Sequence, residues 1–462
     1  MRLPFLDRER EISRLRGCFE GREPSFAVLF GRRRCGKSRL LREAVAGKKC
    51  AYYVGDERDA ALQVRSAAQA AAAVVPGLDQ VEYQGWEPLL DRWWREAPAG
   101  AVLTLDEFPW IVTASPELPA LLQKKIDANT TRPIHTVICG SSQRMMQGFV
   151  LDRNAPLYGR AKEILAVRPL GVHWLGRAFG EKDARKIVDM HATWGGIPRY
   201  WELARDFKDH RAAVRSLVLD PLGVLYQEPE RLLYDHMREL SQAATVLALI
   251  GQGCRKISEI AGRIGKPATA LSRPLQRLLK LGFVRRETPF GQEPRDTKRS
   301  IYAIDDPFLS FWFRFVEPNR SRLEAGLIGA VELDIGRSWD GFVGAAWEAL
   351  AREAVPKLVI GGREWEPAGK WWGSGIDRTP LEADIVARST DGKAVLVGEA
   401  KLNAAPRDLD RLKKMLADKA HRLPVTQDLA VVTCAFAASA PLGRGPQDLQ
   451  VVSGRDVIAV MR

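Results

Sequence analysis

Residues 31–38 combine glycines, a lysine and a serine at a spacing that suits phosphate binding. They read Gly-Arg-Arg-Arg-Cys-Gly-Lys-Ser, which matches the P-loop pattern G-x-x-x-x-G-K-[ST]. Gly31 and Gly36 let backbone N–H groups turn toward phosphate oxygens, and a following helix adds the positive end of its dipole. Lys37 can reach the β- and γ-phosphates, and the Ser38 hydroxyl can bind Mg²⁺. The loop therefore predicts a site for ATP and Mg²⁺.

The residues on either side predict the strand and the helix that must position this loop. Residues 25–30 form a short apolar run, and residues 39–45 have helical apolar spacing. The alternative is a chance match of the motif at a glycine-rich turn. The predicted strand before the loop and the predicted helix after it argue against that alternative. We also expect three neighbouring side chains to contribute to the ATP site: Arg34, Cys35 and Arg39.

A second apolar strand ends in two carboxylates that could serve a bound triphosphate. Residues 101–107 read Ala-Val-Leu-Thr-Leu-Asp-Glu. Asp106 would hold Mg²⁺ through its water shell, and Glu107 would polarise the attacking water. The next apolar strand, residues 135–139, leads to Ser141. Its hydroxyl could sense the γ-phosphate, and an ordinary turn is an equal alternative.

Length and composition indicate a globular protein of several domains. The chain has 462 residues, which suggests roughly three domains. Lys and Arg number 70 against 57 Asp and Glu, a net charge of +13 that favours polyanions such as nucleic acid or an acidic membrane surface. The six cysteines include no C-x-x-C pair, which argues against a zinc site or a disulfide framework. With no signal peptide and no apolar run of about 18 residues, we expect a soluble, cytoplasmic protein without a membrane span.

Three further motifs have counterparts in a known family. Residues 5–11 (FLDRERE), 156–160 (PLYGR) and 194–199 (WGGIPR) accompany the arginine-rich P-loop. Together they resemble the archaeal-type prokaryotic ATPases within the AAA+ and STAND groups, with Asp7 where the entry motif of that family has glycine. The resemblance implies that Arg8 and Pro198 contribute to ATP binding, Pro198 near the base. It also implies a γ-phosphate contact for Arg160, for which a surface arginine is the alternative.

The apolar pattern and the resemblance divide the chain into four predicted domains. These are a P-loop ATPase core in residues 1–166, a helical lid in 167–237, a winged helix in 238–316 and a nuclease-like domain in 317–462. The lid residues show helical apolar spacing, for example at 184–190 and 212–218. The expected fold class is α/β, with an AAA+ core, a helical lid, a winged-helix domain and a C-terminal α/β nuclease-like domain.

Residues 241–302 show helix–turn–helix order followed by two strands around a polar hairpin. Residues 275–284 (LQRLLKLGFV) resemble the end of a winged-helix DNA-binding domain. Residues 241–303 hold twelve Lys or Arg and four Asp or Glu, a net charge of +8, so DNA is an expected partner. A winged helix used only for packing is the alternative. The predicted major-groove residues are Thr269, Ser272, Arg273 and Gln276, and the predicted phosphate contacts in the wing are Arg295, Lys298 and Arg299.

The last third of the chain places carboxylates and a lysine on two predicted strands of a hairpin. Asp384 lies on one strand, and Glu399 and Lys401 lie on the other, where alternation gives them the same side. Two carboxylates can hold Mg²⁺ against a phosphodiester while a lysine steers the attacking water. The pattern resembles the PD-(D/E)xK nuclease fold, with Glu348 on its first core helix. A structural Lys401–Glu399 ion pair, in a domain without cleavage activity, is the alternative.

These features predict an ATP-binding and ATP-hydrolysing protein of the AAA+/STAND kind. Its nucleotide state would reposition the DNA-binding winged helix and the nuclease-like tail. Two other functions remain open: a Mg²⁺-dependent DNA nuclease regulated by ATP, and a non-cleaving ATP-dependent signalling switch that binds a protein partner. Assembly into a homo-oligomer also remains open.

Overall fold

The structure divides the chain into two units, which we describe separately. The computed structural model describes residues 3–128, 132–234, 240–292, 299–439, 446 and 448–461. One unit is Phe5–Pro169, and the other combines Met1–Pro4 with Leu170–Arg462. The four-domain division expected from the sequence stays a prediction. The α/β class is confirmed, with a parallel sheet, a helical segment and a C-terminal mixed sheet.

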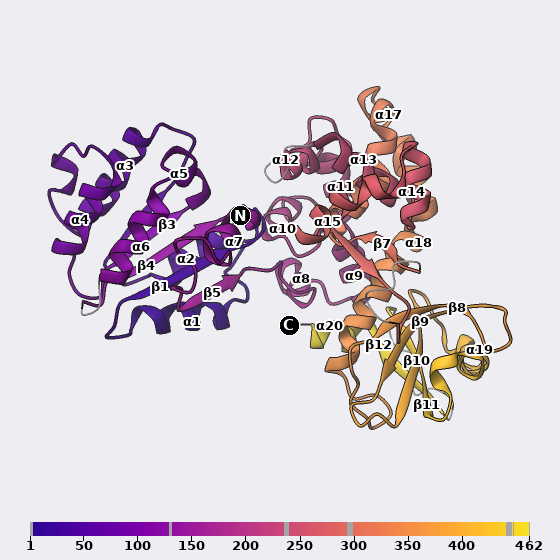
Figure 1. Cartoon of the computed structure of the whole chain (residues 1–462). Coiled ribbons are helices and arrows are strands. Elements are labelled where there is room, and N and C mark those ends of the chain that lie inside the picture. Colours follow the sequence, from indigo (N-terminus) through magenta and orange to yellow (C-terminus); the bar gives the residue numbers. More distant parts are fainter. Residues whose placement is uncertain are drawn as a thin grey trace. The chain divides into compact units, whose positions relative to one another are not determined.

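A five-stranded parallel sheet lies at the centre of the Phe5–Pro169 unit (Figure 1). The strand order is β2–β3–β4–β1–β5. Every residue of β1, β3 and β4 is buried, because a parallel sheet covered on both faces needs continuous apolar strands. The strands are β1 (Ser25–Phe30), β2 (Cys50–Val54), β3 (Val102–Asp106), β4 (His135–Gly140) and β5 (Glu163–Ala166).

Helices precede the first strand of this sheet and join the strands that follow. Parallel neighbours need crossover connections, which helices commonly provide. Trp86, Trp93 and Phe108 come from these helices and are fully buried in the core beside β1 and β3. The helices are α1 (Glu9–Phe19), α2 (Lys37–Ala44), α3 (Ala60–Ala72), α4 (Trp86–Glu96), α5 (Phe108–Ala114), α6 (Leu118–Ala128) and α7 (Gln143–Val150), with the 3₁₀ turn η1 (Leu78–Gln80).

The second unit begins with a helical segment, as the apolar spacing predicts. The residues expected to be helical at 184–190 lie in α9, and those at 212–218 lie in α11 and the π-helical turn η2. The segment consists of α8 (His173–Phe179), α9 (Ala184–Trp194), α10 (Pro198–Ala204), α11 (His210–Val214), η2 (Arg215–Leu219) and α12 (Glu228–Tyr234).

Three helices and a two-stranded antiparallel hairpin follow. Leu271, Leu275 and Leu278 are buried, which gives this part a small apolar core. The hairpin pairs Val284 with Ile304 and Glu287 with Ile301. The elements are α13 (Leu240–Gly251), α14 (Ile257–Ile264), η3 (Ala268–Leu271), α15 (Ser272–Lys280), β6 (Val284–Glu287) and β7 (Ile301–Ile304).

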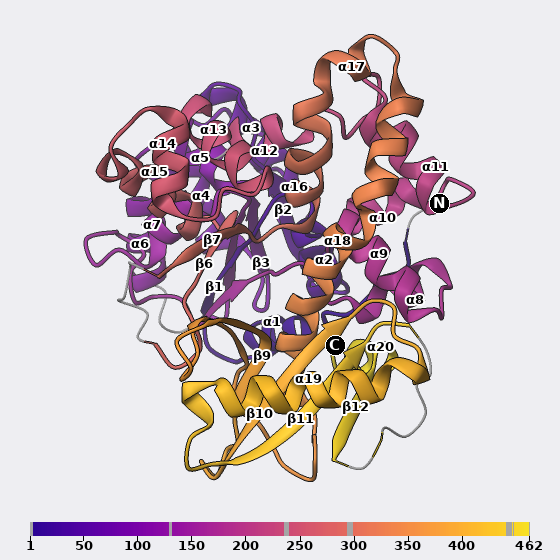
Figure 2. The same cartoon turned by 90° about the vertical axis from the view of Figure 1, so that its right-hand side faces the viewer.

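Several short helices and the long helix α18 then lead to a C-terminal mixed sheet of order β12–β11–β10–β9–β8. β8–β9 and β9–β10 are antiparallel, and β10–β11 and β11–β12 are parallel. Figure 2 shows α19 lying across this sheet, where Leu409, Leu412 and Leu416 enter its core. The elements are α16 (Pro307–Phe311), η4 (Trp312–Val316), η5 (Glu317–Asn319), α17 (Arg320–Glu324), α18 (Ile328–Ala354), η6 (Val355–Lys357), β8 (Gly369–Ser374), β9 (Pro380–Arg388), β10 (Ala394–Lys401), η7 (Pro406–Asp408), α19 (Leu409–Arg422), η8 (Pro424–Thr426), β11 (Ala430–Ala437), β12 (Leu449–Ser453) and α20 (Gly454–Val460).

The helix α18 contacts both the helical segment and the C-terminal sheet. Its 27 residues correspond to a length of about 40 Å. Near its start, Glu332 accepts hydrogen bonds from Arg215 at 2.5 Å and Arg211 at 3.4 Å. Toward its end, Trp347 donates from its indole Nε1 to the carbonyl oxygen of Phe436 on β11 at 3.2 Å. One continuous helix therefore joins two layers of this unit.

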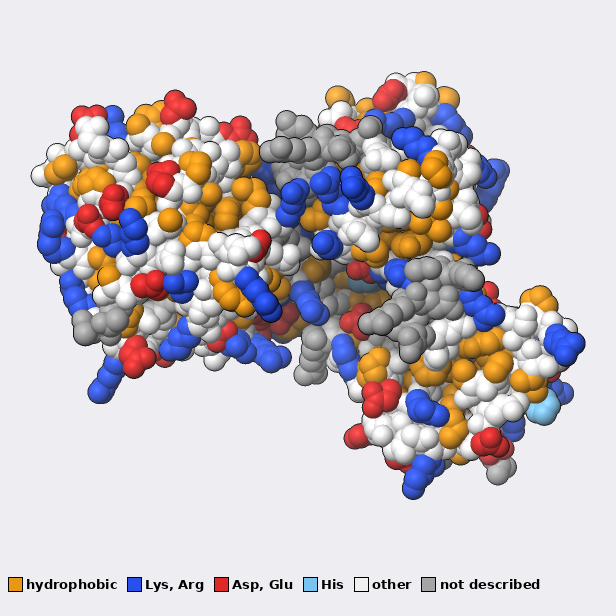
Figure 3. All heavy atoms as spheres, viewed as in Figure 1, with side chains coloured by type: hydrophobic (Ala, Val, Ile, Leu, Met, Phe, Trp, Pro, Cys, Tyr) orange, Lys and Arg blue, Asp and Glu red, His pale blue; other side chains and the backbone are white. Residues whose placement is uncertain are grey.

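The surface carries charges of both signs. Figure 3 shows Lys and Arg side chains spread over the visible face, with Asp and Glu side chains between them. Within the described ranges, no helix has the length and apolar character needed to cross a bilayer.

Candidate functional site

The P-loop, residues 31–38, follows the carboxyl end of β1 directly. A Cβ atom on Gly31 would lie 2.3 Å from the carbonyl oxygen of Val167, so this position has no room for a side chain. Gly36 is the N-cap of α2 and has a φ of 86°, which glycine adopts without strain. The backbone path therefore requires both glycines. It also delivers the loop to the amino end of α2, where backbone N–H groups lack partners within the helix.

Lys37 and Ser38 are the first two residues of α2. The Lys37 side chain is buried, and its Nζ donates to the carbonyl oxygen of Arg32 at 3.0 Å. The ammonium group therefore lies against the loop rather than in solvent. Of the other predicted loop residues, Cys35 is buried and Arg34 has a left-handed φ of 69°.

Asp106 is the last residue of β3 and is 1% exposed. Its carboxylate accepts hydrogen bonds from the Tyr52 hydroxyl at 2.7 Å and from the Glu107 N–H at 2.9 Å. Burial, followed by the negative charge of Asp106, raises the pKa of Tyr52, so this phenol stays protonated and donates. The same hydroxyl lies 3.5 Å from the carbonyl oxygen of Ser38, which ties Asp106 to the start of α2.

The buried thiol of Cys139 lies on β4, the strand between β1, which leads to the P-loop, and β3, which ends at Asp106. Burial raises its pKa, Asp106 raises it further, and the positive charge of Lys37 lowers it. Leu29 lies opposite Cys139 and Leu105 lies opposite Ile138, so the loop after β1 and the end of β3 at Asp106 meet at the same edge of the sheet. The structure therefore brings together the predicted phosphate-binding lysine and the predicted magnesium-binding carboxylate.

Glu107 and Ser141, both predicted for hydrolysis, contact one another. The Oε2 atom of Glu107 accepts hydrogen bonds from the Ser141 hydroxyl at 2.9 Å and from the Ser141 N–H at 3.2 Å. Glu107 has a left-handed φ of 50°, an uncommon conformation for a residue with a Cβ. The carboxylate therefore turns toward the end of β4 instead of continuing the line of β3.

Arg160 lies away from the P-loop of its own chain, and the γ-phosphate contact that the resemblance implies for it stays a prediction. It pairs with Asp127 at 2.7 and 2.8 Å and lies beside Ser25 and Phe26 at the start of β1. The P-loop follows Phe30 at the other end of that strand. The short segment between Arg160 and β5 holds it there, because β5 pairs with β1 from Ala27 onward.

Two motif residues and one residue of α2 were also expected to contribute to ATP binding, and that role stays a prediction for each of them. Arg8 is buried, and its guanidinium donates to Glu11 at 3.0 Å and to the carbonyl oxygen of Arg168. The Arg39 guanidinium lies over the Phe5 ring, 5.4 Å from its centroid. Pro198 begins α10 and belongs to the Leu170–Arg462 unit, so its expected place near the base stays a prediction.

The predicted DNA-contacting residues lie at the surface where the structure describes them. Those on η3 and α15 are exposed, and Leu271, Leu275 and Leu278 between them are buried. The exposed residues are Thr269, Ser272, Arg273 and Gln276. Arg299 is also exposed, and Arg295 and Lys298 lie outside the described residues.

The C-terminal carboxylates lie on neighbouring strands of the mixed sheet. β9 and β10 pair Ile385 with Gly398, and continuing that register places Asp384 beside Glu399. Asp384 accepts a hydrogen bond from the Ala400 N–H at 3.2 Å. The β8–β9 register shifts between Gly369 and Trp371, opposite this stretch of β9. Such irregularities re-aim side chains and are frequent beside active sites.

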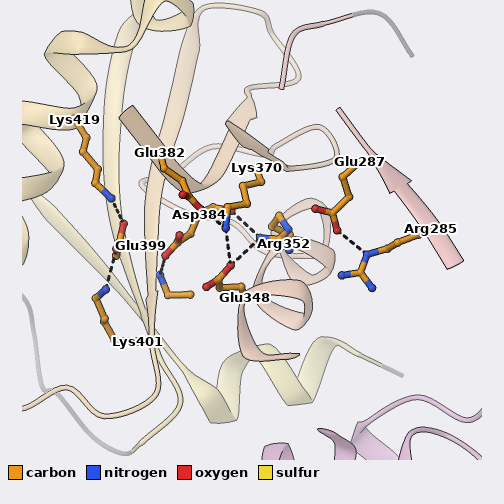
Figure 4. Close-up of polar contacts among 11 residues, drawn as sticks. Arg285, Glu287, Glu348, Arg352, Lys370, Glu382, Asp384, Glu399, Lys401 and Lys419 are labelled. Carbon is orange, nitrogen blue, oxygen red and sulfur yellow. Dashed lines mark hydrogen bonds and ion pairs between the residues drawn. The ribbon is translucent and has the colours of Figure 1, made fainter. Parts of the chain in front are cut away.

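Two lysines hold Glu399 (Figure 4). Lys401 donates to Oε1 at 2.8 Å, and Lys419 of α19 donates to Oε2 at 2.7 Å. Burial alone would raise the pKa of Glu399, but these two hydrogen bonds outweigh it and lower the pKa. The structure therefore contains the Lys401–Glu399 ion pair that the sequence offered as the structural alternative.

The environment of Asp384 acts in the opposite direction. Burial, together with the negative charges of Glu348 and Glu399, raises the pKa of Asp384 to about 6. Glu348 on α18 is itself paired with Lys370 at 3.3 Å and with Arg352 at 3.7 Å. Adjacent carboxyls with pKa values displaced in opposite directions are typical of acid–base sites. Ion pairs in a structural network displace pKa values in the same way.

Comparisons with known proteins give family matches for two segments of the chain, and the first of these segments contains the P-loop. Residues 5–202 match a family described as an ATPase domain predominantly from Archaea. This match includes the P-loop and lies in the amino-terminal part of the chain. Residues 312–414 match a family of archaeal and bacterial proteins of unknown function.

Two individual proteins are similar to this chain over most of its length. An uncharacterized protein of Methanocaldococcus jannaschii is 27% identical over 408 residues, which are 86% of this chain and 87% of that protein. The solved structure of a Walker-type ATPase of Pyrococcus abyssi covers 67% of this chain and 96% of its own, with 20% identity and a TM-score of 0.52. The second likeness shows a shared fold.

The residues of the ATPase domain fit ATP and Mg²⁺. The loop approaches Val167 too closely for a side chain at Gly31, and the buried Lys37 places its ammonium group against the loop, at the carbonyl oxygen of Arg32. Among the described residues, no three His, Cys, Asp or Glu side chains gather as a metal site. Mg²⁺ bound to phosphates needs only one or two carboxylates, which Asp106 can supply with the Ser38 hydroxyl. At Asp384 and Glu399, a metal site stays a prediction.

Three contributors were missed by the sequence analysis. Tyr52 lies on β2, the strand that follows α2 and pairs with β3. Its hydroxyl, a polar group on an apolar strand, was the signal in the sequence that could have identified it. Lys419 and Lys370 reach the C-terminal carboxylates from α19 and β8. Nothing in local spacing links Lys419 to Glu399, because α19 must first pack on β10.

Proposed function

We propose that this protein binds and hydrolyses ATP and that its nucleotide state controls a DNA-contacting winged helix and a PD-(D/E)xK-like tail. The observation that carries the proposal is one constellation at the carboxyl edge of the ATPase sheet. It combines the P-loop, the buried Lys37 and Asp106, and the contact between Glu107 and Ser141. Parallel strands deliver functional groups to this edge of an α/β sheet.

Each residue of this constellation has a defined task in phosphoryl transfer. The P-loop N–H groups and Lys37 bind the phosphate oxygens, and Asp106 and Ser38 hold Mg²⁺. When bound, Mg²⁺ neutralises charge on the β- and γ-phosphates. Glu107 orients the attacking water and accepts its proton, and Ser141 fixes the direction in which the Glu107 carboxylate points. Tyr52 holds Asp106 in place by its short hydrogen bond.

The order of α13–α15 and the β6–β7 hairpin supports the winged-helix part of the proposal. The exposed polar residues of η3 and α15 stand on the outside of a buried leucine core, which suits insertion into a major groove. A γ-phosphate contact by Arg160 would require the P-loop of a second copy of the chain. Control by nucleotide requires that ATP binds one arrangement of the two units better than another.

The test is to measure ATP hydrolysis, DNA binding and DNA cleavage in parallel on the full chain with millimolar Mg²⁺. We expect hydrolysis and a difference in DNA affinity between ATP-analogue and ADP conditions. DNA affinity should fall with rising salt, since phosphate contacts release counterions. Absence of ATP hydrolysis with and without DNA would refute the proposal.

Tyr52→Phe should weaken the use of Mg²⁺ and leave ATP binding without metal unchanged. The variant removes the 2.7 Å hydrogen bond to Asp106. A hydrogen bond to a charged group contributes about 1.5 to 3 kcal/mol, so the Mg²⁺ concentration for half-maximal hydrolysis should rise roughly tenfold or more. Tyr53→Phe is the matched control, since its hydroxyl contacts Gln63 at 3.2 Å. An equal Mg²⁺ requirement in both variants would contradict the role of Tyr52.

A second candidate is a Mg²⁺-dependent DNA nuclease regulated by ATP. The observation that favours it is the opposite displacement of the Asp384 and Glu399 pKa values on neighbouring strands. If the tail cleaves DNA, Asp384→Asn should slow cleavage by roughly a hundredfold or more, with ATP hydrolysis unchanged. Asp391→Asn, at the exposed β9–β10 turn, is the control. Cleavage at the wild-type rate in Asp384→Asn would exclude this carboxylate.

A further inference from the structure

A large cavity lies within the Leu170–Arg462 unit. Its volume is about 750 Å³, and its wall includes residues of α9, α13, both strands of the β6–β7 hairpin, α16, α18 and β8. It therefore adjoins both the hairpin of the proposed winged helix and the helix that carries Glu348. The wall belongs to one unit of the structure.

The wall of this cavity has a positive excess. Six Lys or Arg and four Asp or Glu line it, a difference of +2. Some of these charges neutralise one another, as Arg285 and Glu287 do at 2.7 Å on β6. Arg255 and Arg314 have no hydrogen bond or ion pair from their side chains to any residue that the structure describes. These two guanidinium groups can each bind a phosphate.

Part of the wall comes from residues that lie beside Asp384 (Figure 4). Glu348, Arg352 and Lys370 line the cavity, and Arg352 donates to the Asp384 carbonyl oxygen at 2.9 Å. Glu348 is close enough to act on the charge of Asp384. A molecule that fills the cavity therefore reaches the edge of the Asp384–Glu399 site.

The wall also contains groups that suit bases. Tyr302 on β7 and Phe342 on α18 are among the residues that line it, and aromatic residues beside a cationic groove are typical of sites that bind single-stranded nucleic acids. Nδ1 of His191 is buried, with no hydrogen-bond partner in the described part of the chain.

We propose that this cavity binds a short single-stranded stretch of nucleic acid and leads it to Asp384 and Glu399. The inference rests on the proposed function, because it names the form of nucleic acid that the PD-(D/E)xK-like tail would take. A sphere of this volume is about 11 Å across. A B-DNA duplex is wider than this, because its major groove alone is roughly 12 Å wide. A duplex cannot enter such a space. In this proposal, Arg255 and Arg314 bind phosphates of the strand. The next phosphodiester along the strand then lies toward Asp384 and Glu399.

The test measures binding of fluorescein-labelled dT12 and of a 12-base-pair duplex to the full chain in EDTA, by fluorescence anisotropy. The charge variant carries Arg255→Glu and Arg314→Glu. Its control carries Arg411→Glu and Lys414→Glu, exposed on α19 with the same change in charge. We expect dT12 affinity to fall at least roughly tenfold in the charge variant, since binding follows the number of phosphate contacts. The control should change by less than about threefold.

A steric variant separates cavity occupation from charge. Ala345 of α18 lines the cavity and is exposed, so Ala345→Trp should narrow the space and weaken dT12 binding with no change in charge. Ala417→Trp on the exposed side of α19 is its control. Thermal melting of each variant confirms that it is folded. Equal dT12 affinity in both tryptophan variants would overturn the proposal.

Two further outcomes would overturn it, and neither touches the ATPase proposal. Displacement of dT12 by thymidine monophosphate at equal concentration would make the cavity a site for a small ligand. Equal weakening of dT12 binding in the charge variant and its control would make the effect one of general charge. ATP hydrolysis, measured on the same purified proteins with millimolar Mg²⁺ and without EDTA, should be unchanged in every variant. Its absence in the wild type would refute the proposed function separately.

Discussion

Lys37→Ala should reduce ATP hydrolysis to background and weaken ATP binding by at least about a hundredfold. The Lys37 side chain is buried against the P-loop, where its ammonium group would bind two phosphates in surroundings that exclude water. Each charge-assisted hydrogen bond contributes about 1.5 to 3 kcal/mol, so losing two corresponds to a factor of roughly 10² to 10⁴ in affinity. Calorimetry with a non-hydrolysable ATP analogue and Mg²⁺ measures this directly.

Lys49→Ala is the matched control for this experiment. Lys49 is exposed and lies just before β2 in the same unit, so it loses the same charge without approaching the loop. We expect wild-type binding and turnover from it. Wild-type ATP affinity in Lys37→Ala, with the fold retained in thermal melting, would contradict the assignment of the phosphate site.

Glu107→Gln should bind ATP normally and hydrolyse it roughly 10² to 10³ times more slowly, a typical loss for a missing general base. The substitution keeps the shape of the side chain, and its amide oxygen can still accept from Ser141. It removes only the negative charge that would accept a proton from water. Single-turnover hydrolysis, with ATP binding measured on the same sample, separates the two steps.

The control for this second result is Glu117→Gln, an exposed carboxylate between α5 and α6. It should hydrolyse ATP at the wild-type rate. Ser141→Ala adds a further comparison, because it frees the Glu107 carboxylate without removing it, so a smaller loss is expected. Turnover by Glu107→Gln as fast as that of Glu117→Gln would exclude Glu107 as the residue that activates water.

Local patterns predicted the parts of the protein that depend on neighbours in sequence. The strand, loop and helix around Lys37 follow one another directly, and the hairpin that carries Asp384 and Glu399 is joined by a short turn. Alternation was enough to place Glu399 and Lys401 on one side of a strand, and their contact at 2.8 Å agrees with it.

Positions that depend on packing between distant elements could not be predicted. Arg160 follows a family motif, but the pairing of β5 with β1 holds it at the start of β1, away from the P-loop. Tyr52 reaches Asp106 only because β2 lies next to β3. Lys419 reaches Glu399 only after α19 covers β10, and no spacing within α19 points to a carboxylate twenty residues earlier.

The long helix α18 has a mechanical consequence. Near one end, Glu332 forms ion pairs with Arg215 of η2 and Arg211 of α11. Toward the other end, Glu348 forms ion pairs with Lys370 and Arg352. An α-helix resists bending over this length, since every backbone hydrogen bond along it must be kept. If the helical segment tilted, α18 would therefore tilt with it as one rigid element. Glu348 would then shift relative to Asp384 without any local rearrangement between them.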